Sequence, residues 1–156
     1  MGSGNAALDA IHPQSHQGIC GDAIASMEGI TREELDEVGY RSQQRAAAAS
    51  EFLAGERMAV PLPQRKGDPV LFNTDEFAKP QTTTEGLAAL RPAFRPQNGT
   101  VTAGNASGIN DGAAAVLLMT DKEAEKRGLK VLARIASYAT AGLDPSIMGV
   151  GPIYAS

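Results

Sequence analysis

Hydrophobic spacing predicts helices in the first third of the chain. Gly29 is positioned to end a first helix, whose apolar residues at helical spacing are Ile19, Ala23, Ile24 and Met27. Thr31 can cap a second helix, and Glu34 can complete a capping box with it. Residues 1–18 are rich in Gly, Ser, Pro, Gln and His, so they predict an extended or loop-like segment instead.

The second helix and the residues after it have distinct patterns. Its polar residues Arg41, Gln44 and Arg45 fall largely opposite an apolar stripe, which comprises Leu35, Val38, Ala46, Ala49, Phe52 and Leu53. Prolines exclude a helix over Val60–Thr74, which predicts two short strands around a charged turn. A short helix is predicted over Thr84–Leu90.

Two further strands are predicted in the last third. Ala113–Met119 is an apolar run without alternation, which favours a strand buried on both faces. Thr120 predicts a capped helix that Gly128 stops, and Val131–Thr140 predicts the next core strand. The small and polar residues 99–112 precede the first of these strands, and α/β proteins place ligands at such loops.

Composition narrows the possible classes of protein. Of 156 residues, 42% are apolar and 21% are charged, which is typical of a globular protein. A net charge of −4 and 4% aromatic residues disfavour a nucleic-acid surface. One cysteine, Cys20, fits a reducing compartment, and with His12 and His16 it makes no convincing zinc set. No apolar run reaches the roughly 20 residues that span a bilayer.

A specific motif surrounds the predicted ligand loop. The run from Thr100 to Ala115, Thr-Val-Thr-Ala-Gly-Asn-Ala-Ser-Gly-Ile-Asn-Asp-Gly-Ala-Ala-Ala, closely resembles the signature of thiolases, which make or cleave the carbon–carbon bond of 3-ketoacyl-CoA. Leu90–Phe94 and Met148–Pro152 are also thiolase-like, as are the helical motifs that start at Gly29 and Ser42.

The resemblance implies a fold and a domain organisation. The fold is the layered α/β fold of thiolases, represented by a helical CoA-binding loop domain over residues 1–98 and by strands of the two core halves. Residues 99–128 would end the first half, and residues 129–156 would start the second. Because this is the middle of a thiolase, we expect a longer frame, in which Met1 is an internal methionine.

The resemblance also implies acyl transfer between acyl-CoA and acetyl-CoA or CoA through an acyl-cysteine, by 3-ketoacyl-CoA thiolysis or Claisen condensation. The catalytic motifs of the family, Cys-x-Ser, Asn-Glu-Ala-Phe, Gly-His-Pro and Cys-x-Gly, are missing from the sequence, so no catalytic residue is expected in this chain and the chain alone should be inactive. CoA and acyl-CoA are substrates, and no prosthetic group is expected. The alternative is a non-catalytic thiolase-like protein that binds acyl-CoA or lipid or complements a partner.

Five residues match family positions at the CoA site. Ser107 matches a serine that contacts the pantetheine amides, Ala103 a residue packed against that arm, and His16 a histidine that lines the pantetheine channel. Phe94 matches an aromatic residue near the adenine and the pantetheine, and Lys79 lies where relatives often carry Arg near the nucleotide. For each, a structural or solvent-exposed role is the competing interpretation.

Other polar positions receive simpler interpretations. We interpret Cys20 as a core residue, and Arg65 and Lys66 as solubilising charges at a hairpin tip. Asn110 and Asp111 are expected to bond to the loop backbone. Gly86 replaces a CoA-contacting Ser of some relatives, so that hydrogen bond should be missing.

The expected setting follows from the same resemblance. Full-length thiolases of this type are dimers or tetramers, so a homo-oligomer is expected, without nucleic-acid partners or a membrane span. Thiolases of this type occur in the cytosol, mitochondria or peroxisomes. The N-terminus lacks the basic flank and apolar core of a signal peptide, so the expected location is the cytoplasm, unless a targeting signal belongs to the longer frame.

Overall fold

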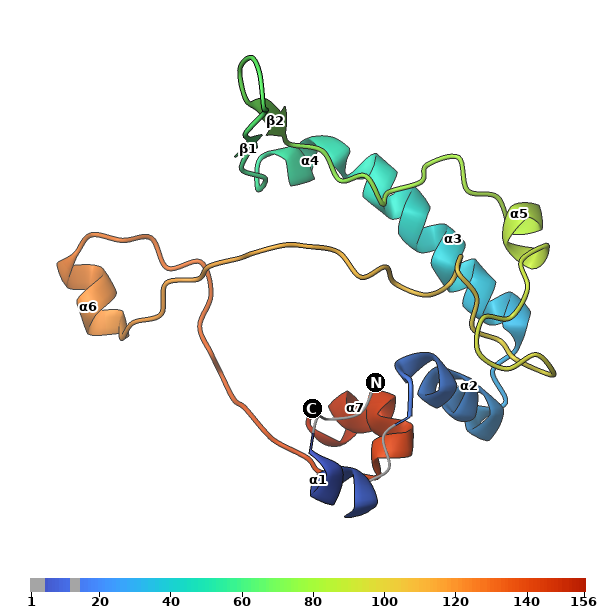
Figure 1. Cartoon of the computed structure of the whole chain (residues 1–156). Coiled ribbons are helices and arrows are strands. Elements are labelled where there is room, and N and C mark those ends of the chain that lie inside the picture. The colour runs from blue at the N-terminus through green and yellow to red at the C-terminus, as the bar shows by residue number, and fades with distance from the viewer. Residues whose placement is uncertain (1–4, 12–14) are drawn as a thin grey trace. The chain divides into compact units, whose positions relative to one another are not determined.

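The structure is a computed structural model that describes residues 5–11 and 15–156. By their internal contacts these residues divide into two compact units, and Figure 1 shows the helices and strands of both. The first comprises residues 15–108, and the second comprises residues 109–156 together with residues 5–11. The predictions for Met1 and His12 lie outside the described residues.

The first unit begins with two capped helices. Helix α2 spans Gln17–Glu28 and ends at Gly29, whose φ of 67° is left-handed. Helix α3 spans Arg32–Ala48. The hydroxyl of Thr31 accepts from the Glu34 N–H at 3.2 Å, and the Thr31 N–H donates to the Glu34 carboxylate at 2.8 Å. The predicted helix end and capping box are therefore confirmed.

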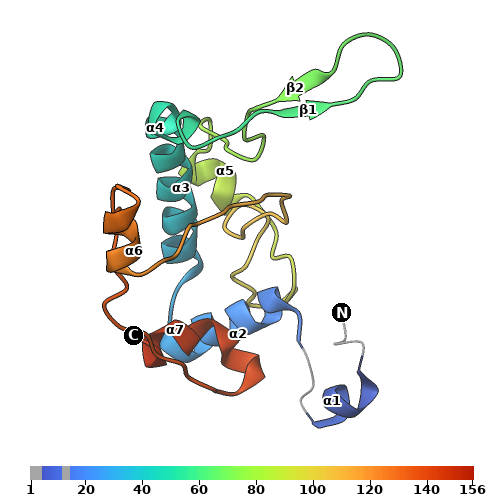
Figure 2. The same ribbon diagram turned by 90° about the vertical axis from the view of Figure 1, so that its left-hand side faces the viewer.

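A hairpin follows the short helix α4 (Ser50–Ala54). Strand β1 (Val60–Leu62) pairs antiparallel with β2 (Val70–Phe72), so that Val60 lies opposite Phe72. Figure 2 shows this hairpin as a two-stranded ribbon with a long connecting loop. The predicted pair of strands is confirmed, and Arg65 and Lys66 are exposed in that loop.

Helix α5 (Thr84–Ala88) packs beside α3 (Figures 1 and 2). The side-chain amide of Gln44 donates to the backbone oxygens of Pro80 at 3.1 Å and Thr82 at 3.3 Å. Of the predicted apolar stripe, Leu35 and Ala46 are half-buried on α3, whereas Val38 is 57% exposed, and Phe52, which lies in α4, is 71% exposed. Polar side chains of α3 face the neighbouring segment because they satisfy its backbone oxygens.

The second unit contains short helices: α1 (Ala6–Ile11), α6 (Asp121–Lys126), the 3₁₀-helix η1 (Pro145–Val150) and α7 (Gly151–Tyr154). The prediction of a loop over residues 1–18 is wrong at α1 and at Gln17, where α2 begins. The carboxamide of Asn5 accepts from the Ala7 and Leu8 N–H groups at 3.1 Å, which favours a helix there. Thr120 caps α6 as predicted, and Gly128 has a φ of 63°.

The two strands predicted in the second unit are wrong. Ala113–Met119 and Val131–Thr140 are extended but unpaired, since the sheet within residues 5–11 and 15–156 contains only β1 and β2. Leu117 and Leu132 are 77% and 89% exposed. A β-strand requires a hydrogen-bonded neighbour, and an apolar run alone does not supply one. No helix in the described part of the chain is long and apolar enough to cross a membrane.

Candidate functional site

A pocket of about 310 Å³ lies in the first unit, and we call it the α3–α5 pocket. It contains two of the predicted site residues, Lys79 and Ala103. Its other lining residues are Gln43, Phe77, Gln81, Thr82, Thr83, Gly86, Leu87, Leu90 and Gly104. The lining thus combines amide, hydroxyl and aromatic groups with one cation, which suits a ligand that has both anionic and apolar parts.

Lys79 supplies the cation of the pocket. Its N–H donates to Oε1 of Gln43 at 2.8 Å, which ties this residue to α3. Its ammonium nitrogen lies 5.4 Å from the centroid of the Phe77 ring, within the range of a cation–π contact. Lys79 is exposed, so its charge is available to an anion as a point charge.

Gly104 allows the loop to approach α5 closely. A Cβ at Gly104 would lie 2.4 Å from Leu87 Cδ2 and 2.6 Å from Leu90 Cδ1, which only glycine avoids. The loop turns around Thr102, whose buried hydroxyl accepts from the Gly104 N–H at 3.2 Å and the Asn105 N–H at 3.3 Å. Ala103 is consequently presented at the pocket with its side chain exposed.

Two other predicted residues contact each other in a second place. The rings of His16 and Phe94 have centroids 4.5 Å apart and planes inclined by 31°. Nδ1 of His16 accepts from the Gly18 N–H at 3.2 Å, so a neutral His16 carries its proton on Nε2. A Cβ at Gly18 would lie 2.0 Å from the Phe94 ring, so this contact depends on glycine.

Ser107, the fifth predicted residue, lies apart from both groups. It is exposed, follows the turn at residues 103–105, and makes no hydrogen bond to another described residue. Its hydroxyl is therefore available to a ligand. The structure brings together Lys79 with Ala103 and His16 with Phe94, but it does not bring all five residues into one pocket.

The loop is held by residues other than those predicted. Asn110 and Asp111 are exposed and make no hydrogen bond to the loop within the described residues, so that prediction is wrong. The carboxamide of Asn105 accepts from the Thr102 N–H at 2.8 Å and donates to the Thr100 oxygen at 2.9 Å. The carboxylate of Asp22, on α2, also binds this loop. The signal in the sequence for the Asp22 contact is an acidic residue among the apolar residues of a predicted helix.

Gly86 lies in the pocket lining. A Cβ there would meet only the Thr83 hydroxyl, at 3.3 Å. Next to it, the pKa of Glu85 is lowered, first by a hydrogen bond from its own backbone N–H and then by the Thr83 side chain. This exposed carboxylate is therefore ionised near the pocket at neutral pH.

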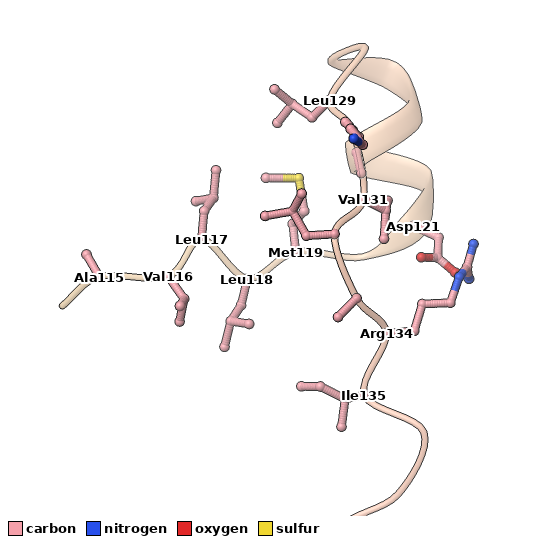
Figure 3. Close-up of a pocket in the computed structure, with 14 residues that line it drawn as sticks. Ala115, Val116, Leu117, Leu118, Met119, Asp121, Leu129, Val131, Arg134 and Ile135 are labelled. Atoms are coloured by element: carbon pink, nitrogen blue, oxygen red, sulfur yellow. The ribbon is translucent and has the colours of Figure 1, made fainter. Parts of the chain in front are cut away.

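The second unit has a larger cavity of about 860 Å³, which is lined mainly by apolar side chains. Figure 3 shows the extended segment from Ala115 to Met119 opposite Leu129, Val131 and Ile135. Side chains of Val116 and Leu118 point to one side and that of Leu117 to the other, as in a strand. None of the five predicted site residues lines this cavity. Its polar feature is the ion pair between Asp121 and Arg134.

The described part of the chain has no exposed thiol and no cluster of metal-binding side chains. Cys20 is 4% exposed in α2, in agreement with its interpretation as a core residue. Residues 5–11 and 15–156 contain no cluster of three His, Cys, Asp or Glu side chains that could hold a metal ion.

Comparison with known proteins gives consistent matches across most of the chain. The family model "Thiolase, N-terminal domain" matches residues 3–122. The acetyl-CoA acetyltransferases of Chromobacterium violaceum and Pseudomonas aeruginosa are each 54% identical over 143 residues, which cover 90% of this chain and 36% of each relative. This chain therefore spans about 36% of the length of these curated relatives.

Solved structures give the same result. The acetyl-CoA acetyltransferase of Bacillus anthracis has a TM-score of 0.80 and 40% identity, covering 92% of this chain and 38% of that one. Human mitochondrial 3-ketoacyl-CoA thiolase has a TM-score of 0.77 and 40% identity, covering 89% of this chain and 35% of that one. The fold is thus that of an α/β protein of the thiolase type, as predicted. The chain belongs to the thiolase family.

Proposed function

We propose that this chain is the CoA-binding middle segment of a thiolase. The whole protein would transfer an acyl group between acyl-CoA and acetyl-CoA or CoA through an acyl-cysteine that lies outside this chain. Related proteins named acetyl-CoA acetyltransferase support this proposal across 90% of the chain. Thiolysis and Claisen condensation are the two directions of this chemistry.

The observation that carries the proposal is the composition of the α3–α5 pocket. Lys79 offers a cation for phosphate and Phe77 an aromatic face, while Thr82, Thr83 and Gln43 offer polar groups. CoA combines phosphates, a purine and two amides. The cation can pair with a phosphate, the aromatic face with the purine, and the polar groups with the amides.

The five predicted residues receive binding roles in this proposal. Ser107 would donate its free hydroxyl to a pantetheine amide, and Ala103 would pack against the same arm. His16 and Phe94 would line the channel as a pair of tilted rings in contact, with the Nε2 proton of His16 available. These residues would hold CoA in place and would thus contribute proximity rather than bond-making.

The test is CoA binding by the full-length product of the gene, measured by isothermal titration calorimetry. Ser107→Ala should weaken CoA binding by about two- to tenfold, the value of one hydrogen bond. Ser42→Ala is the matched control, since Ser42 is exposed on α3 and lies outside the pocket lining. Wild-type protein that does not bind CoA would refute the proposal.

Turnover separates the enzyme from a binding protein. We expect the full-length product to exchange acetyl groups between acetyl-CoA and CoA, and the 156-residue chain alone to be inactive, since its one cysteine is buried. Binding without exchange by the full-length product would favour the non-catalytic alternative. A denatured intact mass above 16.2 kDa from the natural source would show that the product is longer than this chain.

The setting is part of the same proposal. We infer that the full-length protein is a homo-oligomer that uses CoA and acyl-CoA without a prosthetic group. This segment has one cysteine in 156 residues and so allows no disulfide within itself, which suits a reducing compartment such as the cytoplasm. Size-exclusion chromatography with light scattering of the full-length product tests the oligomeric state.

A further inference from the structure

The α3–α5 pocket has two walls from distant parts of the chain. The α5 wall consists of Gly86, Leu87 and Leu90, and the loop wall consists of Ala103 and Gly104. Helix α3 lies beside both walls: it packs against α5, and a Cβ at Gly39 would lie only 3.1 Å from the Gly104 oxygen. Side chains of α3 can therefore join the walls.

Arg32 holds the α5 wall. One terminal nitrogen of its guanidinium donates to the backbone oxygens of Leu87 at 2.6 Å and Leu90 at 3.1 Å. Its Nε donates to Oδ2 of Asp36 at 2.7 Å. The guanidinium is planar and rigid, so these bonds fix the end of α5 relative to Asp36.

Asn105 holds the loop wall. Its carboxamide closes the loop through the Thr102 N–H at 2.8 Å and the Thr100 oxygen at 2.9 Å. The same amide nitrogen donates to Oδ1 of Asp36 at 2.9 Å. The loop that presents Ala103 and Gly104 is thereby tied to the same carboxylate as the α5 wall.

Asp36 is thus the link between the two walls. It is 5% exposed, and each of its oxygens accepts from one partner, Arg32 or Asn105. We propose that Asp36 is a positioning residue, which sets the separation of the α5 wall and the loop wall through Arg32 and Asn105. This inference rests on the proposed function in one respect, because the ligand whose affinity depends on that separation is CoA.

The first test needs no ligand. Asp36→Asn keeps the size of the side chain but replaces one of the two acceptor oxygens by an NH₂ donor, so the bond from Arg32 or the bond from Asn105 is lost. In the full-length protein, amide hydrogen exchange over residues 86–90 and 102–106 should rise together by about tenfold or more, which corresponds to one charge-assisted hydrogen bond. Glu37→Gln is the control, because Glu37 is half exposed and pairs with Arg41 on the surface. Faster exchange in one wall only, or in neither, overturns the inference.

The second test uses CoA. Asp36→Asn should raise the KM for CoA about tenfold while kcat at saturating CoA stays within about twofold, since the reacting groups are not touched. Arg32→Lys retains the positive charge but lacks the planar guanidinium, which bonds to several acceptors at once, so it should also raise the KM for CoA. If Asp36→Asn does not fold, the KM and kcat of Arg32→Lys decide whether the link between the walls affects CoA binding. Glu37→Gln should leave both constants unchanged.

The two proposals fail in different ways. If the wild type does not bind CoA, the proposed function fails, and the exchange experiment still decides whether Asp36 joins the walls. If the wild type binds CoA and both variants bind it equally well, the positioning role of Asp36 is refuted while the proposed function stands.

Discussion

Thr100 donates both its N–H, at 2.6 Å, and its hydroxyl, at 3.0 Å, to the same carboxylate oxygen of Asp22 on α2. The Val101 N–H donates to this oxygen as well, at 3.0 Å. Asp22 is 1% exposed, and its second oxygen is buried without a hydrogen-bond partner among residues 5–11 and 15–156. One carboxylate therefore anchors the start of the ligand loop to α2.

Removal of this anchor should destabilise the protein. Asp22→Ala leaves three donors of Thr100 and Val101 without their acceptor, so we expect the free energy of unfolding to fall by about 2–4 kcal/mol. Urea unfolding of the full-length protein measures this change. Ser26→Ala is the control, since it removes one hydroxyl that donates to the Asp22 backbone oxygen at 2.8 Å. Equal destabilisation by the two variants would contradict the anchoring role.

The contact between His16 and Phe94 depends on Gly18. Gly18→Ala places a Cβ against the Phe94 ring, so the ring must move away from His16, at a cost of about 1–3 kcal/mol. We expect a lower melting temperature and weaker CoA binding in calorimetry. Gly55→Ala is the matched control, because the nearest atom to its Cβ is 3.4 Å away and its φ is −70°. An unchanged affinity in Gly18→Ala would argue against a role for this pair in binding.

Local signals in the sequence predicted α2, the start of α3, α5, α6 and the hairpin, but not α1, η1 or α7. The capping box of Thr31, the left-handed Gly29 and the paired strands around residues 63–69 all depend on residues close in sequence. Such interactions form within one or two turns of the chain, so the sequence contains them directly. The resemblance to thiolases correctly identified the family because a long motif is more specific than any hydrophobic pattern.

Long-range interactions could not be predicted in this way. Ala113–Met119 has the composition of a buried strand, but it lacks a partner strand in this structure. The links from Asp22 to Thr100 and from Asp36 to Asn105 join residues 78 and 69 positions apart. Hydrophobic periodicity describes one segment at a time, so it cannot identify which buried carboxylate accepts hydrogen bonds from which loop.

The charge of Lys79 should contribute to CoA affinity. Lys79→Gln removes a cation at the α3–α5 pocket, so we expect CoA affinity to fall about two- to fivefold at low salt, and the difference to shrink as salt screens the charge. Calorimetry at two salt concentrations measures both effects. Lys66→Gln is the control, because Lys66 is exposed in the hairpin loop. If Lys66→Gln weakens binding as much as Lys79→Gln, the assignment of the two cations is wrong.

Glu85 gives a prediction for pH dependence. Its lowered pKa means that its contribution to stability is present above its ordinary pKa and is lost as pH falls through the lowered value. Thr83→Ala removes one cause of the shift, so the pKa of Glu85 should rise toward its ordinary value. An NMR titration of the Glu85 carboxyl carbon measures this change. Thr74→Ala is the control, since Thr74 bonds to Asn73, and it should leave the Glu85 titration unchanged.

The exposed apolar segments of the second unit predict the behaviour of the 156-residue chain made alone. Val116, Leu117 and Leu118 are all more than 70% exposed and extended, so their unpaired backbone offers an edge for intermolecular pairing. We therefore expect this chain to aggregate, with Leu117→Lys increasing the soluble fraction severalfold. Ser42→Lys on α3 adds the same charge without removing an apolar side chain, so it should help much less. A soluble monomer with a sharp, cooperative melt in light scattering and calorimetry would show that these segments are buried in solution.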